Sequence, residues 1–237
     1  FLDRELGQSN PSGLVALTLD DRVFERAGLR IETQTLIVPV DYGDFDRGVV
    51  ERALRPWLEG DRIDLLVTVS MGRDGFDLER FPGRRRSTTA PDNRNAHSGA
   101  TPEAPLPGLL GGEPLQGPEF LEFSLPAAAM AAVPGPYAVR DNRTVTTLED
   151  GTIEAPSLAA LDGRTAVRGS GGGYLSNEIS SRSLRLRAEL GSTVPTGHLH
   201  TPRVRGHDAD AAAAIVDQAV RIVLAAARAV APDRDPP

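Results

Sequence analysis

The pattern of apolar and polar residues in the N-terminal part of the chain predicts a short helix followed by a strand. Ser9 or Asn10 can cap a helix whose first position is Pro11, so we expect a short helix there. From about 31 to 40 the apolar residues first alternate and then run together, which predicts a β-strand. A helix and a strand therefore open the predicted fold.

The next two segments predict a helix and a buried strand. Apolar residues in 45–60 recur at helical spacing, and Gly60 is a typical residue to end that helix. Residues 62–72 form a continuous apolar run of the kind that a buried parallel strand needs. This alternation predicts βαβ units with helices on both faces of a parallel sheet. Ligands bind at the carboxyl ends of such strands, which places Met71 to Arg73 at a candidate site.

The remainder of the chain predicts a long loop, a hairpin and a helical end. Residues 83–118 are rich in Arg, Pro, Gly and Ser and predict a loop, followed by a short helix near 126–133. Alternating Val and Thr residues meet the turn-forming pair Asp150-Gly151, which predicts a β-hairpin inserted at about 134–160. The last predicted elements are a strand at 164–170, a helix at 174–190, a strand at 192–202 and a long helix capped by Asp208 or Asp210. We expect one domain over 1–231 and a disordered tail at 232–237.

Length and charge narrow the class of protein. The chain has 237 residues and a formal net charge of -7. This length fits one α/β domain, and the acidic balance argues against nucleic acid or a membrane surface as partner, because phosphate contacts need surplus Arg and Lys. The start of the chain has no signal-peptide pattern, and the longest apolar run, near 211–216, is too short to span a bilayer. We expect a soluble, cytoplasmic protein.

Two residue types are missing from the sequence. No cysteine occurs, which excludes disulfides, a thiolate nucleophile and cysteine-ligated zinc. No lysine occurs either, so all 26 basic residues are arginine, which excludes Schiff-base chemistry and phosphate loops that need their lysine. We expect no cofactor and no metal.

Ser176 lies just inside a predicted helix that follows the glycine-rich sequence RGSGGGYL. Backbone N–H groups and the positive end of the helix dipole converge there and can stabilise a nucleophile's anion or an oxyanion. The alternative is that Gly171, Gly172 and Gly173 only permit a tight turn and that Ser176 is an ordinary helical residue. Taken alone, the feature favours the tight turn, because the order differs from the G-x-S-x-G elbow.

Two histidines lie two residues apart on a predicted strand. His198 and His200 should therefore point to one face. They fit a metal pair or a single general base, and alternatively one or both simply sit at a strand end. A single base is favoured, because only His97 and His207 remain as further histidines and a metal needs at least a third ligand.

Two charged features surround the predicted site. Glu79 can reach the carboxyl edge of the sheet, where a carboxylate can orient an imidazole. Alternatively it is a surface residue paired with Arg80, which is the more common situation for a glutamate. Arg84, Arg85 and Arg86 can hold a substrate carboxylate, although a solvated loop explains them more simply.

Five short motifs occur along the chain in the order FLDRELGQSNPS, MGRDGFDLER, APDN, SGGGYLSN and GHLHTP. In this order they resemble the pyrrolidone carboxyl peptidase family, also called pyroglutamyl peptidase I, whose members remove an N-terminal pyroglutamyl residue. The resemblance covers nearly the whole chain. It implies a single α/β domain of the phosphorylase/hydrolase-like kind, with a mostly parallel twisted sheet and helices on both faces. It also implies a peptide or small amide substrate and is compatible with a homo-oligomer.

The spacing of the motifs agrees with the resemblance. Glu79 stands six residues after Arg73 and twelve before Pro91, as in the family. Ser176 and His200 are separated by the family's twenty-four residues. The resemblance therefore implies a triad of Ser176 as nucleophile, His200 as base and Glu79 as the group that orients the base. Serine stands where this thiol peptidase family has cysteine.

Other positions of the implied pocket match or depart from the family. Phe1 matches the first aromatic residue of the pocket loop, whereas Arg4 stands where a second Phe packs on the lactam ring. Arg84 replaces an Asn, and Tyr174 and Leu175 directly precede the nucleophile position. The resemblance makes all five residues candidates for substrate binding. The family's first strand has no counterpart in the sequence, and we expect it upstream.

Three functional alternatives follow from these departures. The first is a non-catalytic or engineered Cys-to-Ser form that binds a peptide or a small cyclic amide. The second is an amidase or acyltransferase with changed acyl specificity, in which Arg4 or Arg84 holds a carboxylate. The third is phosphate binding at the glycine-rich helix start, which the lack of lysine and of a Walker pattern disfavours. A pyroglutamyl-peptidase-like hydrolase is the main prediction.

Overall fold

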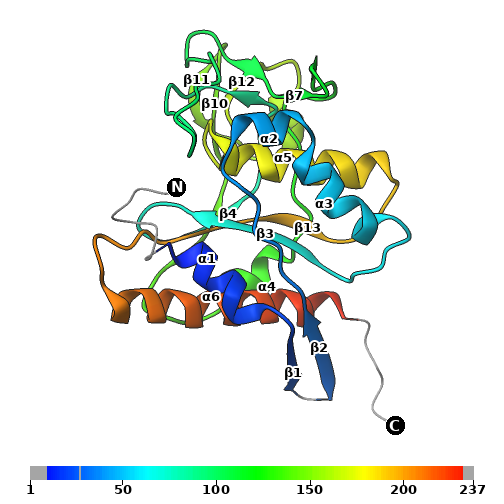
Figure 1. The fold of residues 1–237 in the computed structure, drawn as a ribbon, viewed down its shortest axis with the longest axis vertical. Helices are drawn as coiled ribbons and strands as arrows, with labels where there is room; N and C mark the ends of the chain where they lie inside the picture. The colour runs from blue at the N-terminus through cyan, green and yellow to red at the C-terminus, as the bar shows by residue number, and fades with distance from the viewer. Residues whose placement is uncertain (1–9, 27, 232–237) are drawn as a thin grey trace.

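The computed structural model describes residues 10–26 and 28–231. At its centre lies a four-stranded sheet (Figure 1). Its strands run in the order β3 (Leu66–Met71), β13 (Thr196–Thr201), β4 (Phe76–Glu79) and β9 (Val139–Asn142). β3 is parallel to β13 and β9 is parallel to β4, whereas β13 and β4 are antiparallel. The predicted α/β class is confirmed, but the sheet is mixed.

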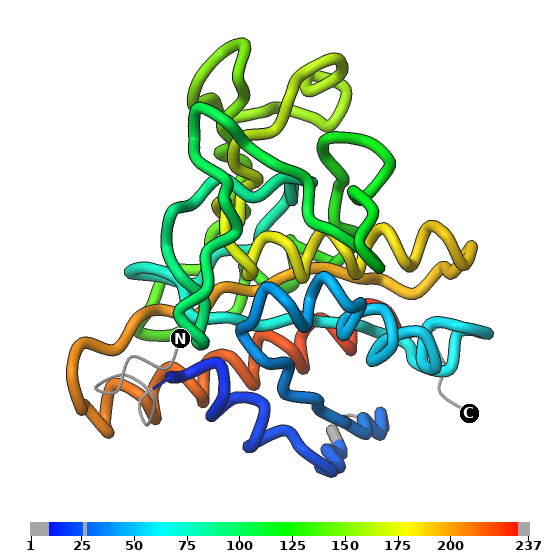
Figure 2. Tube along the Cα trace, turned by 45° about the horizontal axis from the view of Figure 1, so that its top comes forward, coloured from blue at the N-terminus to red at the C-terminus, as the bar shows by residue number. Residues whose placement is uncertain are grey.

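Helices lie on both sides of this sheet, as predicted. One side carries α1 (Pro11–Leu19), α4 (Ala127–Ala131) and α6 (Ala209–Val230). The other side carries α2 (Tyr42–Asp46), α3 (Val49–Leu58) and α5 (Leu175–Glu189). Figure 2 shows α6 running along the sheet with α1 beside it. None of the helices in the described ranges is both long enough and apolar enough to cross a membrane.

Two helix starts follow the cap signals in the sequence. The Asn10 side chain accepts a hydrogen bond from Ser12 N at the start of α1. The Asp208 side chain accepts one from Ala211 N at the start of α6. Each side chain satisfies a backbone donor that the helix itself cannot pair. Of the two candidate cap residues at each helix start, the structure uses Asn10 and Asp208.

A smaller group of strands, which we call the upper lobe, lies beyond α5 (Figure 1). It consists of β10 (Thr144–Thr147), β11 (Gly151–Glu154) and β12 (Ala166–Arg168), the 3-10 helix η1 (Leu158–Leu161), and the loop 83–118 with β5 (Arg85–Arg86), β6 (Leu106–Pro107), β7 (Leu109–Leu110) and β8 (Glu113–Pro114). β10 and β11 are antiparallel, and Gly151, the first residue of β11 after the turn, has φ 69°. This confirms the hairpin predicted at Asp150-Gly151.

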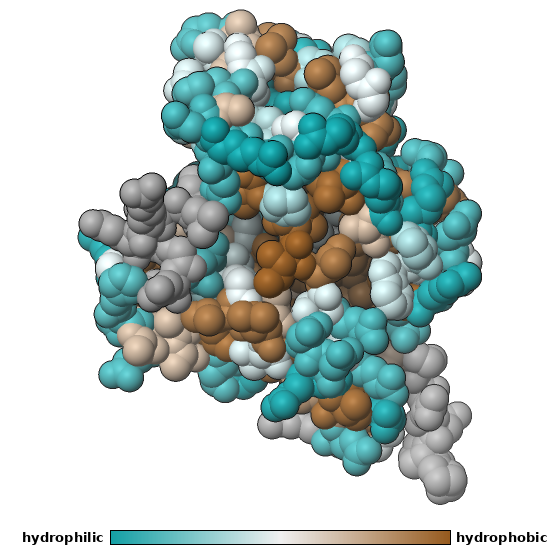
Figure 3. Space-filling view, viewed as in Figure 1, coloured by the Kyte–Doolittle hydropathy of each residue, from teal (hydrophilic) through white to brown (hydrophobic). Residues whose placement is uncertain are grey.

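The strand predicted from about 31 to 40 is wrong in its second half. β2 (Leu29–Thr33) ends early and pairs with β1 (Arg22–Arg26) in a separate hairpin. Residues 34–40 have no strand partner within the described chain, and Leu36 and Ile37 are exposed. In the view of Figure 3, apolar surface surrounds a hollow near the centre of the molecule. The apolar pattern of 34–40 therefore does not come from sheet pairing.

The helix predicted over 45–60 is divided. α2 and α3 are separated at Gly48, whose φ of 78° lies in the left-handed region. Glycine adopts this conformation without the penalty that a Cβ brings, so the chain can turn between the two helices. The apolar spacing was correct, but it did not reveal the break.

β3 lies at the edge of the sheet, which differs from the expected buried parallel strand. Most of its residues are half-buried, whereas β4 and β13 are buried along their whole length. β3 pairs in parallel with β13, the last strand, and not with the segment 31–40. The predicted βαβ pairing of these two early segments is therefore wrong, because a parallel partner can lie anywhere along the chain.

Side chains alternate along β4 and β13, which gives the sheet one apolar and one polar face. Leu78 and Leu199 are fully buried and belong to the core that α6 covers. Glu79 and His200, their sequence neighbours, point to the opposite face, where α5 packs on β13. This alternation places the polar residues together between the sheet and α5.

A buried group of ions, which we call the α5 ion cluster, attaches α5 to neighbouring elements. Glu178 and Arg182, four residues apart on α5, form an ion pair of 2.8 Å. Arg86 binds Glu178 at 2.6 Å and Asp46 at 2.6 Å, and Arg182 binds Glu51 of α3 at 2.9 Å. Burial tends to raise the pKa of Glu178, but the two arginines hold that pKa below its usual value. The cluster therefore keeps its charges by pairing them.

The α5 ion cluster predicts a large cost for removing one cation. Arg182→Met leaves buried Glu51 with only the longer contact to Arg185 at 3.7 Å and leaves Glu178 with only Arg86, so we expect a loss of about 3 kcal/mol in the free energy of unfolding. The matched control is Arg55→Met, because Arg55 forms an exposed pair with Glu189 and should cost at most about 1 kcal/mol. Urea denaturation measures both, and equal losses would contradict the interpretation.

Candidate active site

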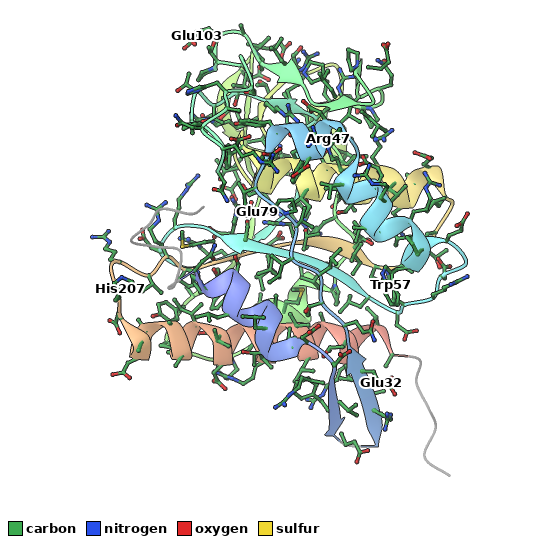
Figure 4. All side chains as sticks on the ribbon, viewed as in Figure 1. Glu32, Arg47, Trp57, Glu79, Glu103 and His207 are labelled. Carbon is green, nitrogen blue, oxygen red and sulfur yellow. The ribbon has the colours of Figure 1, made fainter. Side chains whose placement is uncertain are left out.

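Glu79 and His200 form the central contact of the polar face. His200 Nδ1 lies 2.5 Å from Glu79 Oε1, and both side chains are buried. Glu79 is the last residue of β4, and Figure 4 shows it in the middle of the molecule, where the sheet meets the chain leading to the upper lobe. With Glu79 ionised, Nδ1–H donates to the carboxylate, and Nε2 keeps the lone pair that a general base needs.

Asn142 holds the other oxygen of Glu79. Its Nδ2 donates to Glu79 Oε2 at 2.8 Å and to Ser170 O at 3.0 Å. Asn142 ends β9, which places it beside Glu79 in the parallel register of β9 and β4. The sequence analysis missed this residue, because no motif or spacing indicated that part of the hairpin region would join the main sheet.

The buried position of Glu79 affects its proton affinity. Burial raises the pKa of the Glu79 carboxyl, and the hydrogen bonds from His200 and Asn142 oppose that rise. The raised pKa shows that desolvation outweighs the two hydrogen bonds. Glu79 is thus a carboxyl group whose charge depends on the imidazole beside it.

Ser176 is the second residue of α5. Its Oγ donates to Gly171 O at 3.2 Å, and the residue is partly exposed. Within the described residues no hydrogen bond joins Ser176 to His200. Asn177 N and Glu178 N donate to Tyr174 O, while the earlier N–H groups of a helix have no acceptor within it. Ser176 therefore lies at the positive end of α5, as the sequence predicts.

The start of α5 is tied to the chain that leaves β4. Asn177 Nδ2 donates to Gly83 O at 2.7 Å, and Asn177 Oδ1 accepts from Gly83 N at 2.9 Å. Ser170 Oγ accepts from Phe81 N at 3.0 Å. These three bonds fix the segment that carries Ser176 relative to the segment that carries Glu79.

The glycines before Ser176 permit this close approach. A Cβ on Gly169 would overlap Asn177 Oδ1 and Gly83 N, and a Cβ on Gly173 would overlap Ser87 Oγ. Gly172 has φ 93°, a conformation that other residues rarely adopt. The turn is therefore a close-packed one, in which backbone approach and backbone conformation both require glycine.

Tyr174 and Leu175 pack beside the α5 start. The Tyr174 hydroxyl donates to Pro91 O at 2.9 Å, and its ring meets Tyr42 edge to face at 5.7 Å. Leu175 is buried in a small apolar cluster that includes Tyr42 and Phe45. Both residues thus join α5 to α2 and to the turn around Pro91.

The remaining predicted residues are placed as follows. Arg84 binds Glu119 and donates to Leu115 O at 3.1 Å, and Arg85 binds the same Glu119 at 2.7 Å. Arg86 belongs to the α5 ion cluster. Phe1 and Arg4 lie outside the described residues, as does the tail 232–237.

His198 and His200 lie on one face of β13, as predicted. Their rings meet edge to face at 4.7 Å. His198 is completely buried and binds Thr68 and Ser70 of β3. In the described part of the chain, no group of three or more His, Asp and Glu side chains could hold a metal ion. The two histidines therefore have different partners and are not interchangeable.

A family model and one curated relative match the chain. The model, described as PA0049, C-terminal domain, matches residues 2–119 and 137–205. An uncharacterized protein, PA0049 of Pseudomonas aeruginosa, is 27% identical over 268 residues, covering 83% of this chain and 48% of that protein. The chain spans about half the length of this relative.

Solved structures show the same fold. Pyrrolidone carboxyl peptidase from Pyrococcus furiosus has a TM-score of 0.60 at 17% identity, covering 94% of this chain and 92% of that one. The enzyme from Thermococcus litoralis has a TM-score of 0.61 at 14% identity, covering 95% and 90%. The chain therefore has the α/β fold of pyrrolidone carboxyl peptidases.

The glycine contacts predict that Gly169→Ala destabilises the protein. The added Cβ overlaps Asn177 Oδ1 and the Gly83 backbone, so the site must shift at a cost of about 1–3 kcal/mol or more in the free energy of unfolding. The control is Gly13→Ala in α1, where a Cβ meets open space and should stabilise the helix by up to about 1 kcal/mol. Thermal and urea unfolding measure both; stabilisation by both variants would show that the close approach is unimportant.

The raised pKa of Glu79 predicts how Glu79→Gln changes stability with pH. The stability contributed by protonated Glu79 is present below its unfolded pKa and is lost as pH rises through the raised native pKa. The stability of Glu79→Gln relative to the natural chain should therefore increase as pH rises from about 4 toward 8. Urea unfolding at a series of pH values tests this, with the exposed Glu122→Gln as control. A constant difference across that range contradicts it.

Proposed function

The chain belongs to the family described as PA0049, C-terminal domain, and from its fold and its polar face we propose that it is an amide hydrolase. The proposed reaction removes an N-terminal pyroglutamyl residue. The proposed triad is Ser176 as nucleophile, His200 as general base and Glu79 as the positioning carboxylate. The substrate is a peptide or a small amide.

The contact between Glu79 and His200 carries this proposal. A carboxylate on Nδ1 selects the imidazole tautomer with a free Nε2 and stabilises the imidazolium that forms when Nε2 takes a proton. Asn142 fixes the second carboxylate oxygen, so Glu79 cannot rotate without breaking that bond as well. This is the arrangement that nucleophilic acyl transfer requires of a base and its orienting group.

The proposed steps balance as follows. His200 Nε2 takes the proton of Ser176 Oγ while Oγ forms a bond to the amide carbon. Backbone N–H groups in the first turn of α5 donate hydrogen bonds to the carbonyl oxygen as it gains charge. The C–N bond then breaks, and the leaving amine takes the proton from His200. Water, deprotonated by His200, hydrolyses the ester and restores Ser176.

Ser176 must change one hydrogen bond to act in this way. Its proton is donated to Gly171 O, so rotation about χ1 has to bring Oγ toward His200. Catalytic hydrogen bonds are often long or poorly aligned before substrate binds. The bond to Gly171 also supports a second candidate function, a non-catalytic protein that binds a pyroglutamyl peptide or a small cyclic amide.

A chromogenic pyroglutamyl amide tests the proposal. The natural chain should release the chromophore, and Ser176→Ala should lower kcat by roughly 10⁴-fold or more because the nucleophile is lost. Glu79→Gln should lower kcat by roughly 10²-fold to 10⁴-fold with a smaller change in KM, because the imidazole loses its tautomer control. Ser12→Ala, at the first turn of α1, is the matched control and should retain full activity.

Ser176→Cys separates the two candidate functions. A thiol is intrinsically the stronger nucleophile, so this variant should turn over the same amide if the geometry suits acyl transfer. No release by either the natural chain or Ser176→Cys would refute the hydrolase. Binding of a pyroglutamyl peptide by both the natural chain and Ser176→Ala would then select the binding protein.

A further inference from the structure

His198 is a second, fully buried imidazole that the proposed mechanism does not use. Its Nδ1 lies 2.8 Å from Thr68 Oγ1, and its Nε2 lies 2.7 Å from Ser70 Oγ. Both partners belong to β3, where Thr68 pairs with His198 and Ser70 pairs with His200 in the parallel register. One imidazole therefore links two hydroxyl groups of the neighbouring strand.

The hydrogen-bond donors in this group can be assigned. Thr68 Oγ1 also lies 3.2 Å from Gly197 O, which can only accept a hydrogen bond, so the Thr68 hydroxyl donates to it. The hydroxyl oxygen then accepts Nδ1–H from His198. This leaves a lone pair on Nε2, which accepts the hydroxyl proton of Ser70. The Ser70 proton thus points at His198, and the lone pairs of the Ser70 oxygen point away from that ring.

This pairing does not make Ser70 a nucleophile. A base at His198 would have to hold a positive charge in a fully buried place, and no carboxylate contacts its ring within the described residues. Burial and the nearby His200 both lower the pKa of His198, which keeps the imidazole neutral. His200, by contrast, has Glu79. The two histidines therefore fit two roles, and His198 is suited only to orient a hydroxyl.

Ser70 occupies a position beside the proposed base. It is opposite His200 in the register of β3 and β13 and is partly exposed at the edge strand. Two residues further on, a Cβ on Gly72 would lie 2.8 Å from His200 Cβ, so the backbone after Ser70 passes directly over that residue. The Ser70 hydroxyl contacts the His198 ring at 2.7 Å, and that ring meets the His200 ring at 4.7 Å, so a ligand that reaches His200 comes close to the Ser70 oxygen.

We propose that Ser70 is a substrate-binding residue whose oxygen, fixed by His198, accepts a hydrogen bond from an N–H group of the acyl part of the substrate. This inference rests on the proposed hydrolase function and extends it to the choice of acyl group. An acyl group with an N–H next to the carbon that bears the scissile carbonyl, as in a cyclic amide, is recognised. An acyl group of the same shape with CH2 in place of N–H meets an unpaired lone pair.

Two chromogenic amides test the inference in turnover. One carries the pyroglutamyl group, and the other carries its cyclopentanone analogue, in which CH2 replaces the ring N–H. The natural chain should prefer the N–H substrate by roughly tenfold in kcat/KM, the range of one neutral hydrogen bond. Ser70→Ala should bring this ratio close to one, because the N–H substrate loses its hydrogen bond and the CH2 substrate no longer meets an unpaired oxygen. An unchanged ratio overturns the inference.

Two further variants guard against a purely structural effect. Thr68→Val keeps the side-chain shape but removes the acceptor of Nδ1–H, so the ratio should fall between those of the natural chain and Ser70→Ala. Thr152→Val removes a hydroxyl from β11 of the upper lobe and should leave the ratio unchanged. If Ser70→Ala does not fold, the ratios of the natural chain and Thr68→Val decide. Equal use of both substrates by the natural chain overturns the inference.

Binding measurements separate this inference from the hydrolase proposal. The probes are 2-pyrrolidone and cyclopentanone, which differ only in N–H against CH2, and ligand-observed NMR compares their affinity for the natural chain and Ser70→Ala. A preference for 2-pyrrolidone that Ser70→Ala abolishes supports the inference even if no amide is hydrolysed. Turnover with no such preference leaves the hydrolase standing and overturns the role of Ser70, and so does a failure of both probes to bind.

Discussion

The close approach of two backbones holds the polar face together. Asn177, at the start of α5, binds both the backbone N–H and the backbone C=O of Gly83, and this is possible only because Gly169 has no side chain at the contact. The bond joins the chain after β4 to the helix that carries Ser176. If the two backbones lay one side chain further apart, Glu79 and Ser176 would belong to unconnected surfaces.

The α5 ion cluster supports the polar face by holding α5 against α3 and β5. α5 has buried charges on the side where an ordinary helix has apolar residues, and each charge is paired with a partner from another element. A buried ion pair contributes little net stability compared with apolar packing, yet it has strict geometric demands. The arrangement fixes the rotation of α5 about its axis, and with it the direction of its first turn.

The sequence predicts some neighbours within the polar face and misses others. The resemblance to a peptidase family implies that Glu79 and His200 act together, and the structure places their side chains in contact. The partners Asn142, Thr68 and Ser70 were missed, because each depends on strand register. β9 comes from a hairpin region, and β3 pairs with the last strand, so neither neighbour is close in sequence. Periodicity predicts which residues form strands, but not which strands are adjacent.

The same limit explains the error at 31–40. That segment has the composition of a strand, and strand formation needs a partner that composition does not specify. The helices fared better because their hydrogen bonds are local: α6 follows from its apolar stripe and the cap residue Asp208, and α5 occupies nearly the range that the sequence predicts. Hydrogen bonding between residues that are close in the chain can be predicted from a single sequence, whereas pairing between strands that are far apart in the chain cannot.

Asn142 has a consequence for the independence of the upper lobe. It ends β9, and β10 begins two residues later, so this connection between the main sheet and that lobe is very short. The amide that steadies Glu79 is therefore also the last main-sheet residue before the chain enters the lobe. Any displacement that separates β9 from β4 also breaks the hydrogen bond between Asn142 and Glu79. The alignment of the His200 ring therefore depends on the pairing of these two strands.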